Sequence, residues 1–310
     1  EDLSPAVRKA VAEQKLDPSK IPATGPHGRL TKEDVANYAQ PGNGAAASPP
    51  APAAKPAATA GPAPTQSTPP PAAAGFDADG VKRQPMSKIR KRIAENLVRA
   101  QQTAAILTTF NEIDLTDLMA LRGRYKEQFE KTYGVGLGFM SFFVKAVVLA
   151  LREFPRVNAF LEGDDMVFHD FVHMGIAVST DRGLAVPVMR HAERMSFAKI
   201  ESEIKRLATA ARDGKLGLEE LSGGTFTITN GGVFGSLLST PILNPPQSGI
   251  LGMHAIQKRP MVVGDEIKVR QMMYVALSYD HRIVDGRESV SFLVRLKQYL
   301  EDPARLMLEV

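Results

Sequence analysis

Cysteine is absent from the 310 residues of the chain. Disulfides, thiolate metal sites and a cysteine nucleophile are therefore excluded, and the composition suits a reducing compartment. The longest apolar run, "SFFVKAVVLAL", is too short to cross a bilayer and contains Lys145, so we expect no membrane partner. No signal peptide opens the chain, and because it begins with Glu1 rather than methionine we expect a fragment of a longer protein.

Charge gives little support for a nucleic-acid partner. The formal net charge is only +4, and no aromatic-plus-basic pattern supports such a partner, so none is predicted. The one dense basic patch is "KIRKRIAENLVR", Lys88 to Arg99. Ile89, Ile93, Leu97 and Ala100 recur within it at the spacing of one helix face. Its charges are typical of a solvated helix surface.

Residues 1–40 have the composition of a very small folded domain. The stretch "SPAVRKAVAEQ" predicts a helix with Ser4 as N-cap and Pro5 at the first position. After the glycine-rich loop "ATGPHGRLT", the stretch "TKEDVANYA" predicts a second helix capped by Thr31. A core of this size is marginal alone, so binding to a larger partner is its natural role.

Residues 41–80 are dominated by alanine and proline, which fill 24 of the 40 positions. Such a segment cannot bury enough apolar surface to fold. We expect a disordered linker that tethers two working parts, although a spacer without further function is the alternative.

Residues 81–310 have the mixed pattern of an α/β catalytic domain with a mixed sheet. Helices are predicted at 87–101, 116–131, 140–153, 196–213 and 285–300, and the helix at 140–153 is apolar on most sides and should be buried. Strands are predicted at 108–115, 172–180, 184–190, 224–230, 249–257 and 271–279. Within "STDRGLAVPV" we expect a turn between two strands.

The stretch "SYDHRIVDG" places His281 after a strand and before a long helix. Histidine is the side chain best suited to remove a proton near neutral pH, and a thiol with a pKa near ~8.5 needs such a base to become a nucleophile. Asp285 follows four residues later, and Gly286 suits a tight turn into the helix. Taken alone, this spacing favours a structural histidine over a catalytic one.

A metal site is an alternative for the same residues. Asp280, His281 and Asp285 can supply ligands, with His254 or His169 from elsewhere. His169 and His173 stand at the H-x-x-x-H spacing, but His173 falls in the predicted strand 172–180, so the two do not share one helix face; no H-E-x-x-H is present. We therefore predict no metal.

Three threonines alternate along the predicted strand in "GGTFTITNGG". Thr229 stands last, where the strand opens into a loop, and a hydroxyl there can donate to an oxyanion. The same alternation is also the ordinary pattern of a half-exposed strand, which this stretch alone favours. The glycines form no dinucleotide-binding fingerprint.

Together, these motifs resemble the 2-oxo acid dehydrogenase acyltransferases. "DHRIVDG" matches the D-H-R-x-x-D-G signature of that family, which shares its fold with chloramphenicol acetyltransferase. "PMSKIRKRIAENL", "STDRGLAVPV", "GGTFTITNGG" and "NPPQSGILGM" resemble other blocks of the family, in the right order. The first 40 residues resemble its peripheral subunit-binding domain, and the alanine- and proline-rich stretch resembles its linkers. The resemblance covers nearly the whole chain.

The resemblance implies direct acyl transfer between two thiols, with no covalent enzyme intermediate. His281 is then the base for the coenzyme A thiol, Thr229 the oxyanion donor and Asp285 a structural support. The acyl group is carried by the lipoyl group of a lipoyl domain, and no such domain precedes Glu1 in this chain. No metal is required.

The resemblance also implies partners. The family places its active site between subunits of a trimer and assembles trimers into a hollow cube. Arg8, Lys9 and Arg29 match the basic residues that the family presents to dihydrolipoyl dehydrogenase. The other partner is the 2-oxoglutarate decarboxylase component, and the expected location is the bacterial cytoplasm.

The acyl group is indicated by other stretches. "TTFNEID", "GVFGSLLSTPILNPPQSGILGMHAI" and "MMYVALSYDHR" resemble the succinyl-transferring branch. Ser236 and His254 are then candidates to bind the free carboxylate of the succinyl group, with simple packing as the alternative. An acetyl- or branched-chain acyltransferase is the runner-up. A scaffold without activity is disfavoured, because scaffolds of this fold tend to lose the histidine motif.

Overall fold

The computed structural model describes residues 5–13, 16–23, 30–38 and 75–309. The chain separates into two compact units, Glu1–Ala73 and Ala74–Val310. The predicted N-cap Ser4 lies outside the described residues, as does the predicted linker up to position 74. No helix within the described ranges is both long enough and apolar enough to cross a bilayer.

The amino-terminal unit contains the two predicted helices. They are α1 (Pro5–Glu13) and α2 (Lys32–Tyr38), with a 3-10 turn, η1 (Pro18–Lys20), between them. Its buried apolar side chains are Val7, Val11, Ile21 and Val35. Thr31 caps α2 as predicted: its hydroxyl accepts from the Asp34 N–H at 3.3 Å, and the Asp34 carboxylate accepts from the Thr31 N–H at 2.8 Å.

The larger unit mixes helices and strands. Its helices are α3 (Lys88–Thr103), α4 (Thr116–Tyr133), α5 (Met140–Glu153), α6 (Phe197–Asp213), α7 (Gly286–Glu301) and α8 (Pro303–Leu308), with 3-10 turns η3 (Pro155–Asn158), η4 (Ala192–Arg194), η5 (Leu218–Leu221) and η6 (Gly232–Phe234). Its strands are β1 (Ile106–Asp114), β2 (Phe160–Glu162), β3 (Asp165–Val167), β4 (Met174–Ile176), β5 (Val178–Thr180), β6 (Gly183–Ala185), β7 (Val188–Met189), β8 (Phe226–Asn230), β9 (Gly249–Met253), β10 (Gln257–Val263) and β11 (Glu266–Asp280). The five predicted helices are confirmed, while α8 was not predicted.

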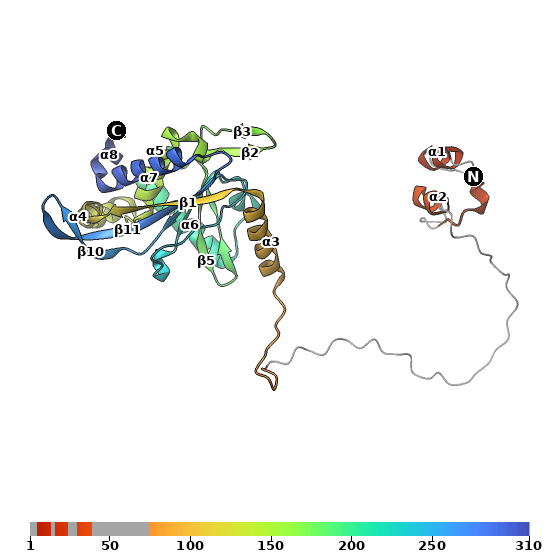
Figure 1. The fold of residues 1–310 in the computed structure, drawn as a ribbon, viewed down its shortest axis with the longest axis horizontal. Helices are drawn as coiled ribbons and strands as arrows, with labels where there is room; N and C mark the ends of the chain where they lie inside the picture. Colours follow the sequence, from red (N-terminus) through yellow and green to blue (C-terminus); the bar gives the residue numbers. More distant parts are fainter. Residues whose placement is uncertain (1–4, 14–15, 24–29, 39–74, 310) are drawn as a thin grey trace. The chain divides into compact units, whose positions relative to one another are not determined.

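One mixed sheet organises this unit (Figure 1). Its strand order is β1-β11-β9-β8-β4-β7, and β10 pairs with the other half of β11. β9, β8 and β4 are parallel to one another, whereas β11 runs antiparallel to both β1 and β9. The predicted α/β class with a mixed sheet is confirmed.

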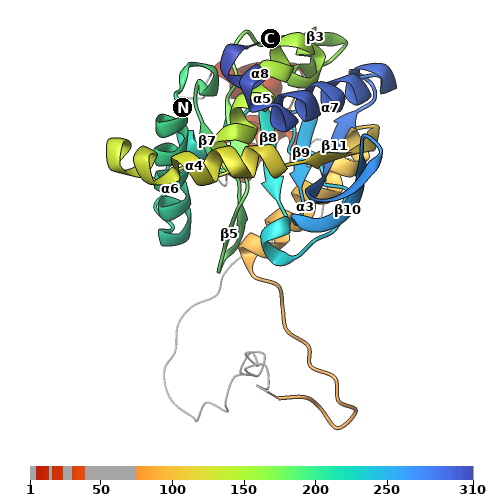
Figure 2. The ribbon, with the colours of Figure 1, turned by 90° about the vertical axis from the view of Figure 1, so that its left-hand side faces the viewer.

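Helix α5 forms the centre of the core, as its all-round apolar sequence predicted. Ten of its residues are buried, and each large apolar side chain removed from water contributes about 1.5–3 kcal/mol. α5, α7 and α8 lie together on one side of the sheet (Figure 2). Phe139 at the start of α5 offers no capping side chain, and the buried carboxylate of Glu201 accepts from the Ser141 N–H at 3.0 Å instead.

Two strand predictions were wrong in detail. The predicted strand at 172–180 is interrupted at Ala177, where β4 ends and β5 leaves the main sheet to form a hairpin with β6. That hairpin contains the turn expected within "STDRGLAVPV". Strands β2, β3 and β10 were not predicted, and Pro260 lies inside β10. The structure tolerates Pro260 because β10 is an edge strand, which leaves the proline's missing N–H without consequence.

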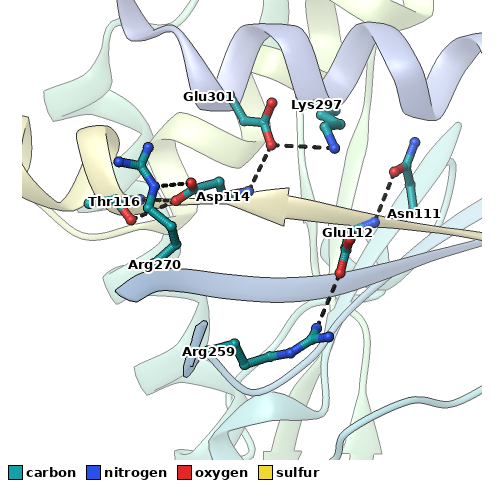
Figure 3. A network of polar contacts seen from close by, with 8 residues as sticks. All are labelled: Asn111, Glu112, Asp114, Thr116, Arg259, Arg270, Lys297 and Glu301. Carbon is teal, nitrogen blue, oxygen red and sulfur yellow. Dashed lines mark hydrogen bonds and ion pairs between the residues drawn. The ribbon is translucent and has the colours of Figure 1, made fainter. Parts of the chain in front are cut away.

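A polar network joins the carboxyl end of β1 to α4, α7 and β11 (Figure 3). Asp114 ends β1, and its carboxylate accepts from the Thr116 N–H at 3.0 Å, from the Thr116 hydroxyl at 2.6 Å and from Arg270 of β11. Glu301 of α7 accepts from the Asp114 N–H at 2.8 Å. Burial alone would raise the pKa of Asp114, but the hydrogen bonds from Thr116 and Arg270 lower it below its usual range.

We predict that Asp114→Asn lowers the free energy of unfolding by about 1.5–3 kcal/mol at neutral pH, because it replaces charge-assisted hydrogen bonds by neutral ones. Since the folded-state pKa of Asp114 is lowered, its contribution is complete above about pH 4 and is lost as the pH falls through that folded-state value. Urea unfolding between acidic and neutral pH measures both effects. A variant with the wild-type acid dependence would contradict this role.

Candidate active site

The main chain of His281 is fixed at the junction of three elements. Strand β11 ends at Asp280, and the His281 N–H donates to the Ala105 carbonyl, just before β1, at 2.9 Å. The turn that follows is closed by the N–H groups of Ile283 and Val284, which both donate to the Asp280 carbonyl at 3.0 Å. The backbone around His281 is therefore rigidly held before its side chain makes any contact.

The two neighbours of His281 pair with each other. The Arg282 guanidinium donates to both carboxylate oxygens of Asp280, with a shortest distance of 2.6 Å, and the Ala105 N–H donates to the same carboxylate at 3.2 Å. Burial alone would raise the pKa of Asp280, but Arg282 and these backbone donors lower it below its usual range. Asp280 is thus an ionised anchor for the turn rather than a proton acceptor.

The imidazole of His281 remains open. It is exposed in the single chain and lies against the Tyr279 ring, with 5.7 Å between ring centroids. Within the part of the chain that the structure describes, no hydrogen bond engages either ring nitrogen. A substrate thiol can therefore approach it directly.

Asp285 serves the next helix. Its carboxylate accepts from the Glu288 N–H at 2.8 Å, and Glu288 accepts from the Asp285 N–H at 3.5 Å, which makes a capping box at the start of α7. Arg156 then pairs with Glu288 at 3.2 Å. These contacts suit the structural role that the sequence favoured for Asp285, and any part in the reaction stays a prediction.

Thr229 differs from the two threonines that precede it, Thr225 just before β8 and Thr227 on it. Thr225 bonds the backbone of His173, and Thr227 donates to Gln247 at 2.6 Å. Thr229 is half-buried, and its hydroxyl has no hydrogen-bond partner among the described residues. It is the one of the three that is free to donate to a ligand.

Ser236 lies in the loop that follows β8. The Ser236 N–H donates to the carbonyl of Gly231, two residues after Thr229, at 3.2 Å, and its own carbonyl accepts from the Ala255 N–H at 2.9 Å. Its hydroxyl forms no hydrogen bond within the described ranges, so it too can meet a ligand.

His254 is buried, and both of its ring nitrogens are engaged. Nδ1 lies 2.9 Å from the Tyr274 carbonyl, and Nε2 lies 2.9 Å from the Ser239 hydroxyl. A carbonyl only accepts, so Nδ1 donates to Tyr274, and Nε2 faces the Ser239 hydroxyl. His254 can reach a carboxylate only when Ser239 moves. Ser239 was not identified from the sequence, because no local pattern links it to His254, which lies 15 residues later.

The sheet separates these residues into two groups. Thr229 pairs with Gly252, and Gly252 pairs with Ala276 of β11. His281 lies five residues beyond Ala276, so at about 3.4 Å per residue and about 4.8 Å per strand it is roughly 20 Å from Thr229. Thr229, Ser236 and His254 thus share one end of the sheet, and His281 with Asp285 lies at the other. One chain alone does not bring both groups to the same reacting atom.

No group of three or more histidine, aspartate or glutamate side chains in the described ranges forms a metal-site cluster. His169 and His254 are the two more distant candidate ligands. The Nδ1 atom of each lies within hydrogen-bond distance of a backbone carbonyl, that of Asn158 and that of Tyr274, respectively.

Two of the three predicted partner-binding residues lie on α1. Arg8 and Lys9 are both exposed, and Lys9 forms an exposed ion pair with Glu13 at 3.8 Å. Arg29 lies outside the described residues.

Comparison with known proteins agrees with the division of the chain. Residues 78–308 match the 2-oxoacid dehydrogenases acyltransferase (catalytic domain) model, and residues 2–36 match the e3 binding domain model. The chain is 54% identical over 308 residues to the dihydrolipoyllysine-residue succinyltransferase component of the 2-oxoglutarate dehydrogenase complex of Escherichia coli, covering 99% of this chain and 72% of the relative. The corresponding protein of Pseudomonas aeruginosa is 55% identical, with 99% and 73% covered.

Solved structures support the same relationship. A probable dihydrolipoamide acetyltransferase of Listeria monocytogenes superposes with a TM-score of 0.69 at 39% identity, covering 72% of this chain and 96% of that one. The dihydrolipoamide acetyltransferase of Azotobacter vinelandii, whose structure addresses the catalytic roles of a serine, a histidine and an asparagine, gives 0.71 at 34% identity, with 73% and 94% covered. The chain belongs to the 2-oxoacid dehydrogenase acyltransferase family.

Proposed function

We propose that the chain transfers a succinyl group between a dihydrolipoyl group and coenzyme A, as the core component of a 2-oxoglutarate dehydrogenase complex. The observation that carries this proposal is the 54–55% identity, over nearly the whole chain, to relatives named for that activity. The acetyltransferase structures are less similar, at 34–39% identity, so acetyl or branched-chain transfer is the weaker candidate. An exposed, unbonded His281 on a rigid turn fits either acyl group.

The reaction follows from the open groups. His281 accepts the proton of the coenzyme A thiol, and the thiolate attacks the carbonyl carbon of the succinyl thioester. The Thr229 hydroxyl donates to the tetrahedral oxyanion. Collapse of the intermediate breaks the bond to the lipoyl sulfur, and the imidazolium returns its proton to that sulfur. One thiol is consumed and one is released, and no residue of the chain becomes acylated.

His281 and Thr229 act from different copies of the chain in this proposal. Their separation of roughly 20 Å in one chain follows from the sheet register. A second copy can bring its His281 to Thr229, as expected from the family's placement of the active site between subunits. A related chain forms the cubic core of a pyruvate dehydrogenase complex, which supports trimers arranged in a cube here.

The succinyl carboxylate is bound beside Thr229 in this proposal. Ser236 offers an unengaged hydroxyl in the loop that follows Thr229, bonded through its N–H to Gly231. His254 contributes when Ser239 releases its Nε2, or holds the loop of Ser236 through Ser239 when it does not. Both roles make His254 matter more for succinyl than for acetyl transfer.

Other components complete the assignment. The e3 binding domain match supports docking of dihydrolipoyl dehydrogenase on the small unit through Arg8, Lys9 and Arg29. The names of the relatives support a dihydrolipoyl group as carrier within a 2-oxoglutarate dehydrogenase complex. The family resemblance adds a 2-oxoglutarate decarboxylase component as the source of succinyl groups and coenzyme A as their acceptor. Their bacterial sources support the bacterial cytoplasm as the place of action.

His281→Ala should lower kcat for succinyl transfer by about 10²–10⁴-fold, because the thiol then loses its base. The assay uses succinyl-coenzyme A with free dihydrolipoamide. His191→Asn is a matched control, since His191 is an exposed histidine whose positive φ asparagine accepts. A His281→Ala enzyme with more than about a tenth of wild-type kcat would reject the base role.

Mixed assemblies test whether the site spans two copies. Thr229→Ala alone should lose about 10²–10³-fold in kcat. When it is coexpressed with His281→Ala, random mixing leaves about a quarter of the interfaces with both groups intact, so activity should return to that level. A site within one chain predicts no recovery, because every chain carries one defect.

Ser236→Ala and His254→Ala should each raise KM for succinyl transfer more than for acetyl transfer, because only the succinyl group has a free carboxylate to bind. Parallel assays with succinyl- and acetyl-coenzyme A give the ratio. Equal losses for the two acyl groups would assign both residues to packing alone.

A further inference from the structure

Helix α3 carries a concentration of positive charge that no acidic side chain in the described residues neutralises through an ion pair. It carries Lys88, Arg90, Lys91, Arg92 and Arg99 against a single acid, Glu95. All five basic side chains are exposed, and within the described ranges none of them forms an ion pair; Arg99 donates only to Asn96, at 3.0 Å.

Arginines elsewhere in this unit are more often paired. After α3, nine of the fifteen arginines form ion pairs: Arg152, Arg156, Arg194, Arg206, Arg259, Arg270, Arg282, Arg295 and Arg305. Five basic side chains without an ion pair on one helix of 16 residues are therefore a concentration of charge specific to α3.

The charge is also directed. At 3.6 residues per turn, Lys88, Lys91, Arg92 and Arg99 fall on one side of α3. Ala100, which is buried, and Ile93, which is half-buried, fall on the opposite side and face the unit. The four cations thus form a basic stripe that points outward.

The basic stripe lies on a helix that ends two residues before a hydrogen-bond partner of His281. α3 ends at Thr103, and Ala105 bonds the Asp280 carboxylate at 3.2 Å and the His281 N–H at 2.9 Å. α3 runs from there to the margin of the unit (Figure 1). At 1.5 Å per residue, Arg99 and Lys88 lie roughly 10 and 25 Å along the chain axis from Ala105.

We propose that the basic stripe is the docking surface for an acidic protein domain that carries the acyl thioester to His281. This rests on the proposed function, in which the acyl group arrives on a lipoyl group. A folded carrier of about 100 residues has a radius of gyration near 13 Å, so its body covers the surface beside the histidine that its thioester reaches. Charge complementarity to four outward cations requires that body to be acidic, and it speeds a brief encounter that must repeat at every turnover.

The test compares two carriers of the same acyl group. Lys91→Glu combined with Arg92→Glu reverses the centre of the stripe. Lys126→Glu combined with Lys205→Glu makes the same charge change on α4 and α6, at exposed lysines outside any ion pair in the described ranges. For each full-length protein, kcat/KM is measured with a succinylated lipoyl domain and with free succinyl-dihydrolipoamide, at low ionic strength and at about 0.5 M salt.

The stripe variant should lose about 10-fold in kcat/KM with the lipoyl domain at low salt, and the loss should disappear at high salt. Its kcat/KM with free succinyl-dihydrolipoamide, its assembly state by light scattering and the behaviour of the control variant should stay unchanged.

Three results would overturn the proposal. An equal loss with both carriers, through a raised KM for coenzyme A, would assign the stripe to coenzyme A phosphates. A smaller assembly would assign it to contacts between copies. An unchanged kcat/KM with the lipoyl domain would leave the stripe as solvated surface. If the wild type transfers another acyl group instead of succinyl, the proposed function fails while the carrier comparison proceeds with that group.

Discussion

The register of β11 is the constraint on which the larger unit depends. This strand of 15 residues pairs with β1 along nine residues, with β9 near its end and with β10 near its start. Met273, Val275, Leu277 and Tyr279 alternate into the core as a result. A slip of one residue would turn that set outward and separate Asp280 from Ala105. The ion pair of Arg270 with Asp114 joins β11 to β1 and supports this register. At the end of β11 the Asp280 carboxylate does the same by accepting from the Ala105 N–H.

The same register distributes chemical roles among three neighbouring ionisable residues. Asp280 is buried and paired, so its charge anchors the turn. Asp285 caps α7 and fixes where the turn ends. His281 between them has a held backbone and a free ring. The negative charges thus contribute structure, which leaves the histidine as the group that can exchange a proton with a substrate.

The sequence predicted what depends on local pattern and on composition. Helix periodicity located five helices, and the absence of cysteine together with "DHRIVDG" pointed to His281 as a base for substrate thiols. Contacts between residues far apart in the sequence could not be predicted from it. The Ser239–His254 bond joins a loop to a strand end, and the separation of Thr229 from His281 follows from pairing across three strands. Strand β10 was also missed, and whether Pro260 is tolerated within it depends on β10 being at the edge of the sheet, which the sequence alone does not show.

In the proposed reaction, direct transfer between two thiols gives a physical reason for dividing the site between chains. A thiolate attacks a thioester faster when water is excluded, yet both substrates are long and must enter from separate directions. On one chain His281 is exposed, so it cannot provide that exclusion. A second copy that covers His281 while presenting Thr229 excludes water and supplies the oxyanion donor in one step. In the proposed reaction, assembly is therefore part of the chemistry, and the opposite placement of the two groups on one sheet is what makes a single chain incomplete.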